Sequence, residues 1–182
     1  MIIERALKDL FKDITVNGRE VQFNYGTQRE LNQWIAFRNT NQLAKFPLIW
    51  YVSNDYKEFN GSYKVNNARI IVFMNTDYNW LNETREVKTF ETWIEPIVKE
   101  VLKSFKLSMY VDVFGKNDFE KYRYRDVRNY GVSTDTKNQM ESNSFNSSQP
   151  KSTKSITTDI VDATVIDFDF EIKPNCIINK KY

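Results

Sequence analysis

The segment DFEIK, Asp169–Lys173, carries the residues best suited to chemistry in this 182-residue sequence. Glu171 and Lys173 are two positions apart, so their side chains would point to the same side of a β-strand. An acidic residue upstream, Asp159 or Asp162, could supply a second carboxylate. Carboxylate oxygens are the ligands that Mg²⁺ prefers, and a nearby lysine can orient or activate an attacking water. The spacing therefore indicates a candidate site for metal-dependent hydrolysis.

This arrangement resembles the carboxylates and lysine of restriction-type nucleases, which hold a metal ion at a site flanked by helices. In this sequence, however, Asp167, Asp169 and Glu171 alternate regularly with phenylalanine and isoleucine. Such alternation is typical of the solvent-exposed face of an amphipathic strand. We therefore favour a solvated strand face with no catalytic residue and no metal, and keep a Mg²⁺-dependent nuclease as the alternative function.

Three features of the composition narrow the range of possible enzymes further. The sequence has no histidine, which excludes Ser-His-Asp and Cys-His catalysis and removes the commonest transition-metal ligand. Its one cysteine, Cys176, cannot form an intrachain disulfide or a zinc cluster. The five glycines form neither a GxGxxG nor a Walker pattern, so we expect no small-molecule cofactor. The expected function is therefore not enzymatic.

The composition is that of an ordinary folded domain. Hydrophobic residues make up 41% of the chain and the formal net charge is only +2, so no strong overall field favours binding to nucleic acid or membranes. No apolar run approaches the ~18–20 residues of a membrane span. The charges between Glu4 and Asp9 argue against a signal peptide. We predict one domain over residues 1–182 and no association with membranes.

Aromatic and basic residues are interleaved in EKYRYRDVRNY, residues 120–130. Surfaces that bind nucleic acid share this composition, but Glu120 and Asp126 dilute the positive charge and no nucleic-acid-binding motif accompanies it. Arginine and tyrosine are also the residues that protein interfaces favour. We therefore predict a subunit interface formed by Tyr122, Arg123, Tyr124, Arg125, Arg128 and Tyr130.

Two shorter helices are predicted near the N-terminus. Apolar residues recur at helical spacing in residues 2–14, which predicts an amphipathic helix of about three turns. Thr27 and Glu30 have the spacing of a capping box, which predicts that a second helix starts there. The polar segment 38–45 ends it.

The clearest helical stripe is the apolar series of residues 90–105. Thr92 and Glu95 have capping-box spacing, so the regular helix could start at Thr92 with Pro96 near its first turn. The alternative is a longer helix that starts near Lys88 and is kinked at Pro96.

Strands are predicted between the helices. A turn at Asn17-Gly18 precedes one strand, and residues 46–59 and 63–75 form a buried hairpin around a turn at 60–62. Another strand lies in residues 107–115. The sequence therefore predicts an α/β (α+β) fold: a mixed, largely antiparallel sheet with one long amphipathic helix packed on it and the N-terminal helix beside it.

The last strand, in residues 155–173, has a change of phase. Apolar residues occupy odd positions up to Val165 and even positions from Ile166 onward. A slip of one residue would turn every later side chain to the other face of the sheet. We therefore predict a β-bulge or a sharp bend between Val165 and Ile166.

A long polar insertion, residues 116–155, precedes this last strand. Its second part, residues 136–155, has only two apolar side chains, Met140 and Phe145. Such a composition cannot drive packing by itself. Long loops in small domains are usually either functional or disordered, and we predict an extended arm that lies across a neighbouring subunit after assembly.

The order of these elements, with segments such as FPLIWYV and TFETWIEPIVKEVL, resembles the tail-terminator (tail-completion) proteins of tailed bacteriophages. The resemblance covers most of residues 1–115 and 156–172, and the insertion departs from it. The asparagine-rich composition is similar to that of phages of Bacteroidetes-type hosts, including the crAss-like group. Proteins of the tail-terminator family are small α/β subunits that form rings between head and tail.

The resemblance implies a structural virion protein, without catalytic residues, that is assembled in the host cytoplasm. Its partners would be copies of itself in a hexameric or dodecameric ring, and adjacent neck, portal-side or tail proteins. DNA would pass through the ring without sequence-specific binding. An arm that reaches over a neighbouring subunit would explain the insertion, because its ordering entropy is lost only on docking.

Overall fold

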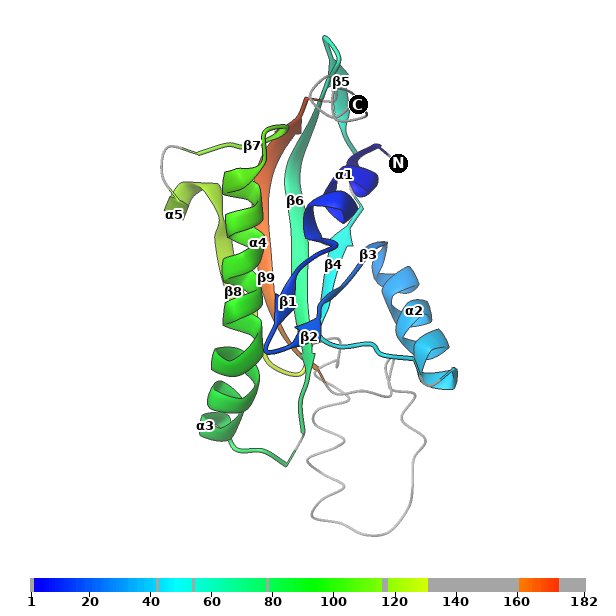
Figure 1. The fold of residues 1–182 in the computed structure, drawn as a ribbon, viewed down its shortest axis with the longest axis vertical. Helices are drawn as coiled ribbons and strands as arrows, with labels where there is room; N and C mark the ends of the chain where they lie inside the picture. Colours follow the sequence, from blue (N-terminus) through cyan, green and yellow to red (C-terminus); the bar gives the residue numbers. More distant parts are fainter. Residues whose placement is uncertain are drawn as a thin grey trace.

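The computed structural model describes residues 2–41, 43–53, 55–77, 79–115, 118–130 and 161–173. Their main sheet is mixed and largely antiparallel, as predicted (Figure 1). Its strands are β3 (Gln22–Gly26), β4 (Leu48–Val52), β5 (Lys57–Phe59), β6 (Ser62–Asn75), β7 (Val111–Val113), β8 (Arg123–Val127) and β9 (Val161–Ile172). The order is β3-β4-β6-β9-β7, with β5 beside β6 and β8 beside β9. Among these strands only β3 and β4 run parallel.

Helices cover the two faces of this sheet unequally. On the first face lie α1 (Ile2–Phe11) and one long helix, made of α3 (Asn82–Arg85), the π-helical segment η1 (Glu86–Ile94) and α4 (Glu95–Leu107) (Figure 1). On the second face α2 (Gln28–Thr40) packs against a smaller core. The short β1 (Thr15–Val16), β2 (Arg19–Glu20) and α5 (Asp118–Lys121) complete the fold.

The two helix layers explain the change of phase in β9. Val161, Ala163 and Val165 belong to the second-face core under α2, whereas the even residues from Ile166 to Ile172 belong to the first-face core. Pairing with β6 runs through Val165 and Ile166 without a shift, so the predicted bulge at this position is wrong. The apolar residues change sides because α2 covers only part of the second face, while the strand itself stays regular.

The irregularity lies instead in the partner strand β6, between Val65 and Ala68. Asn67 has a φ of 52°, in the left-handed region that asparagine tolerates better than most residues. Its backbone N–H donates to Asp169 Oδ1 across the strands at 2.6 Å. Asp169, one of the acidic residues of the DFEIK segment, therefore accepts a backbone hydrogen bond at a bulge.

The long helix starts earlier than either prediction, at Asn82, so a start at Thr92 is wrong and a start near Lys88 is closer. Sequence patterns of period 3.6 do not reveal a π-helical segment, whose hydrogen bonds run five residues back. The Glu95 N–H donates to the Phe90 carbonyl in this way. The wider turn ends just before Pro96, which cannot donate a backbone hydrogen bond.

The predicted capping box of α2 is confirmed. The Glu30 backbone N–H donates to Thr27 Oγ1 at 3.3 Å, and the Thr27 N–H donates to Glu30 Oε2 at 2.6 Å. This backbone hydrogen bond, followed by that of the Thr27 hydroxyl, lowers the pKa of Glu30. Helices α1 and α2 end at Phe11 and Thr40, close to the expected positions.

The boundaries of the polar insertion need correction. Residues 118–130 form α5, β8 and a turn, so they belong to the sheet and not to an arm. The remainder of the predicted arm, residues 116–117 and 131–155, lies outside the described residues. Its flanks meet, because the Tyr130 N–H donates to the Val161 carbonyl at 2.8 Å. No helix in the described part of the chain is long and apolar enough to span a membrane.

Candidate functional site

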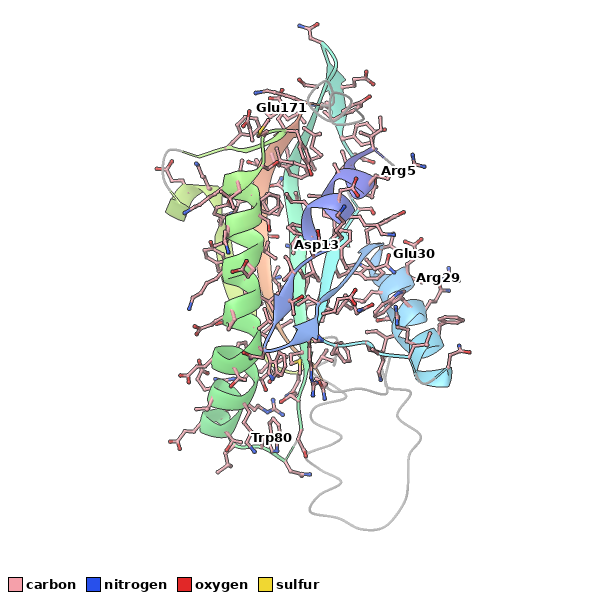
Figure 2. The ribbon with its side chains drawn as sticks, viewed as in Figure 1. Arg5, Asp13, Arg29, Glu30, Trp80 and Glu171 are labelled. Carbon is pink, nitrogen blue, oxygen red and sulfur yellow. The ribbon has the colours of Figure 1, made fainter. Side chains whose placement is uncertain are left out.

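The structure does not bring the proposed nuclease residues together. Asp162 and Glu171 are both on β9 but differ in parity, so their side chains point to opposite faces of the sheet. Nine residues of strand separate their backbones by about 30 Å. Glu171 lies at the end of β9 next to β7 (Figure 2). Asp159 lies outside the described residues.

Glu171 and Lys173 instead belong to a cluster of acidic and basic side chains on the second face. Glu171 is the register partner of Lys64 on one side and of Asp112 on the other. Lys173 forms an ion pair with Asp112. Within the described residues, no group of three or more cysteine or acidic side chains is arranged to hold a metal ion. This cluster has the composition of a solvated strand face.

Asp162, at the other end of β9, belongs to a buried cluster formed by an ion pair and hydrogen bonds. Its side chain is fully buried and lies 3.5 Å from the Arg85 guanidinium, which is also buried. Asp162 Oδ1 accepts from the Asn129 N–H at 2.9 Å, and Arg85 donates to Asn129 Oδ1 at the same distance. Arg85 also donates to the Asp77 carbonyl. The cluster ties the start of the long helix to the turn after β8 and to β9.

Two of the six predicted interface residues pack in or against the core. Tyr122 is only 3% exposed and packs against the rings of Phe105 and Phe168. Tyr130 packs edge-on against Phe73 at 5.0 Å, and burial raises the pKa of its phenol. Tyr122 is therefore a core residue, and Tyr130 is partly buried against the second-face core.

The other four predicted interface residues are at the surface. Arg128 pairs with Glu86 at 2.9 Å and lies 6.0 Å above the Phe90 ring. Arg123, Tyr124 and Arg125 are exposed along β8, which pairs with β9 alone among the described strands. Tyr124 stacks on Tyr122, with ring centroids 6.2 Å apart. The sequence placed these residues in a polar insertion, whereas the structure makes them an exposed strand at one edge of the sheet, which we call the β8 edge (Arg123–Val127).

The charges at the β8 edge continue a pattern that crosses the sheet. Arg69 on β6 binds Asp167 on β9 with an Nε–Oδ1 distance of 2.7 Å. Asp167 is in turn the register partner of Arg123 on β8. Basic and acidic side chains therefore alternate from strand to strand, and the row ends on an exposed arginine.

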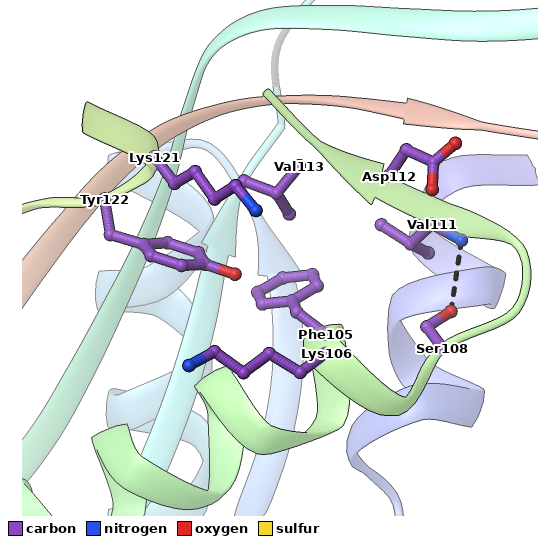
Figure 3. Close-up of a pocket in the computed structure, with 8 residues that line it drawn as sticks. All are labelled: Phe105, Lys106, Ser108, Val111, Asp112, Val113, Lys121 and Tyr122. Carbon is purple, nitrogen blue, oxygen red and sulfur yellow. Dashed lines mark hydrogen bonds between the residues drawn. The ribbon is translucent and has the colours of Figure 1, made fainter. Parts of the chain in front are cut away.

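The structure also contains two hollows that the sequence did not indicate. One, of about 230 Å³, lies beside β7, and Lys106, Lys121 and the Tyr122 hydroxyl point into it (Figure 3). The second, of about 410 Å³, follows the outer edge of β3 between α1 and α2. Its lining residues are Lys8, Lys12, Glu20, Val21, Gln22, Phe23, Asn24, Tyr25 and Arg38. We call this second hollow the β3 slot.

The described part of the chain thus offers two exposed sheet edges and no convergent catalytic group. Comparison with known proteins adds no assignment: no protein-family model matches the sequence, and no curated protein matches it significantly.

Proposed function

We propose that this chain is a structural subunit that self-associates into a ring in the neck of a tailed-phage virion, as a tail terminator does. The observation that carries the proposal is the β8 edge, where Arg123, Tyr124 and Arg125 are exposed on an edge strand. Among the described strands β8 pairs with β9 alone, and an edge strand of this kind can add a strand of a neighbouring molecule. Arginine and tyrosine are the residues that most often anchor such contacts.

The position of the β8 edge supports a ring more than an isolated dimer. Two copies joined through the same β8 strands in the register centred on Tyr124 would place Arg123 of one copy beside Arg125 of the other, and like charges in register are destabilising. The β8 edge is therefore better matched to a different surface of the next copy. A contact between two different surfaces generates a closed ring when the rotation closes.

The polar insertion supports the same proposal through its location. The hydrogen bond between Tyr130 and Val161 brings both flanks of the insertion to the end of β8. A segment that leaves the domain there starts beside the proposed subunit contact. It could extend over a neighbouring copy or over an adjacent neck, portal-side or tail protein, while DNA passes through the ring.

Native mass spectrometry at about ten micromolar tests the proposal, because interfaces of ordinary affinity are populated at that concentration. We expect hexamers or dodecamers for the unmodified protein, and a shift to monomers for the double variant Arg123→Glu/Arg125→Glu. The control is Arg5→Glu/Lys57→Glu, which makes the same change of charge at exposed positions on α1 and β5.

Two results would contradict the proposal. One is an unmodified protein that remains monomeric even at a tenfold higher concentration. The other is an oligomer that survives the β8 variant and the control variant equally, which would place the contact elsewhere on the molecule.

A further inference from the structure

The β3 slot differs from the β8 edge in being concave. Helix α1 borders it from the first face of the sheet and α2 from the second face, so the outer edge of β3 forms its floor. Its volume of about 410 Å³ lies in the range of clefts that bind ligands, roughly 300–1,000 Å³. The floor has an apolar component, formed by the buried Val21 and the half-buried Phe23.

The backbone of β3 at this floor is partly free for a further strand. In a parallel pair, alternate residues direct both backbone groups to the same side. The Gln22 N–H donates to the Pro47 carbonyl, and the Gly26 carbonyl accepts from the Ser53 N–H, so the even residues face β4. Phe23 and Tyr25 therefore face the slot. The Tyr25 N–H is bonded to Asn24 Oδ1 at 2.9 Å. Within the described residues, the N–H and carbonyl of Phe23 and the Tyr25 carbonyl are then the groups of β3 that face the slot without a backbone partner.

The walls of the slot are predominantly cationic. Lys8 comes from α1, Lys12 from the turn directly after it and Arg38 from α2, against the single carboxylate of Glu20. Arg38 is held in place by the Ala44 carbonyl at 2.6 Å and by the Trp34 ring, 4.6 Å from its guanidinium carbon. Lys8 and Lys12 are exposed and make no ion pair or hydrogen bond within the described residues. Their charges are available to a bound anion.

We propose that the β3 slot binds an extended acidic segment of another protein, which adds as a strand to the outer edge of β3. Lys8 lies in the last turn of α1 and Lys12 follows directly after its end at Phe11, a separation of four residues that corresponds to about 6 Å of helical rise. Same-face residues of a strand repeat every 6.4–6.8 Å, or about the same spacing. Two carboxylates at alternate positions of the added strand can thus reach the two lysines, while intervening side chains point toward Arg38.

A second copy of this chain and a nucleic acid strand match the β3 slot less well than an acidic peptide does. Among the edge strands of a second copy, β3 has no carboxylate in residues 22–26, β8 carries Arg123 and Arg125, and the three-residue β5 and β7 carry one carboxylate each. A nucleic acid strand would match the cations, but its backbone has no N–H donors for the carbonyls of Phe23 and Tyr25. An acidic peptide matches both the charge and the strand edge.

A fluorescein-labelled octapeptide of alternating glutamate and valine is a direct probe, measured by fluorescence anisotropy with the full-length protein. We expect saturable binding that weakens when NaCl is raised from about 50 to 300 mM, since exposed charges are screened. The variant Lys8→Glu/Lys12→Glu should bind at least tenfold more weakly. The control variant Arg5→Glu/Lys57→Glu, with the same change of charge outside the slot, should bind as the unmodified protein does.

Amide hydrogen exchange separates strand addition from contact through side chains alone. Exchange of the Phe23 N–H should slow by tenfold or more when the peptide is added, because this N–H acquires a backbone acceptor. An unchanged exchange rate at Phe23 would overturn the added strand, even if the peptide binds.

The remaining outcomes also decide against the proposal. Equal peptide affinity of the slot variant and the control would overturn the site. Tighter binding of octathymidylate than of the peptide would assign the slot to nucleic acid. Loss of self-association in the slot variant without peptide, seen by sedimentation velocity, would assign it to contacts between copies. None of these readouts requires that the β8 edge forms a ring.

Discussion

The side-chain amide of Asn17 donates a hydrogen bond to the carbonyl of Thr92 at 2.7 Å, and so joins the β1–β2 turn to the long helix. Thr92 lies four residues before Pro96, which has no N–H to offer this carbonyl. Asn17 has a φ of 49°, and this left-handed conformation holds the side chain at the turn. The turn therefore replaces the hydrogen bond that proline removes from the helix.

Replacing Asn17 with glycine should lower the free energy of unfolding by about 1 kcal/mol, the usual net contribution of a hydrogen bond. Glycine tolerates the positive φ, so backbone strain does not contribute. In a Pro96→Ala background, the backbone N–H of the new alanine can donate to the Thr92 carbonyl, so the same replacement should cost less. Urea unfolding of the four proteins in this double-mutant cycle measures the coupling. Equal costs in the two backgrounds would contradict the compensation.

The buried pair of Arg85 and Asp162 should contribute much more to stability than the partly exposed pair of Arg69 and Asp167. Arg85→Ala leaves the Asp162 carboxylate buried without its cation, which typically costs about 3–5 kcal/mol. Arg69→Ala breaks the Asp167 pair, whose arginine side chain is 41% exposed, and should cost at most about 1 kcal/mol. Urea unfolding of both variants gives the comparison. Similar losses would show that the buried cluster does not hold the helix and β9 together.

The features that the sequence predicted correctly are those encoded by neighbouring residues. The capping box of Thr27 and Glu30 depends on two side chains three positions apart, and the Asn60-Gly61 turn on two adjacent residues. Packing between distant elements was not encoded in this way. The phase change at Val165 has the pattern of a bulge, but the side of β9 that is covered depends on where α2 docks.

In the candidate sites, too, the features that depend on packing between distant elements could not be predicted from local sequence patterns. The aromatic and basic composition of residues 120–130 predicted a subunit interface, but the burial of Tyr122 depends on the ring of Phe105, which lies on α4. Arg85 and Asp162 are 77 residues apart, and neither has a local pattern that points to the other. The β3 slot combines side chains of α1, β3 and α2, so it exists only after the sheet has assembled.

Glu30 should make stability depend on pH near the start of α2. Hydrogen bonds from Thr27 hold the pKa of this carboxyl below its ordinary value of 4.5 in the folded state. A carboxyl with a lowered folded-state pKa stabilises the fold above its unfolded-state pKa, and this contribution is lost as the pH falls through the folded-state pKa. The stability difference between the unmodified protein and Glu30→Gln should therefore shrink as the pH falls below 4.5. A difference that is constant from about pH 6 to about pH 3 would contradict this role.

The separation of Asp162 from Glu171 predicts that the DFEIK segment does not support metal-dependent cleavage. Because carboxylates that share a Mg²⁺ ion lie within a few ångströms of it, about 2.0–2.1 Å for direct ligands, residues on opposite faces of β9 cannot bind the same ion. Plasmid DNA incubated with the purified protein and Mg²⁺ should remain intact, at the level of a metal-free control. Cleavage that is abolished by Glu171→Ala but not by Glu58→Ala, an exposed control on β5, would instead establish the nuclease and displace the ring proposal.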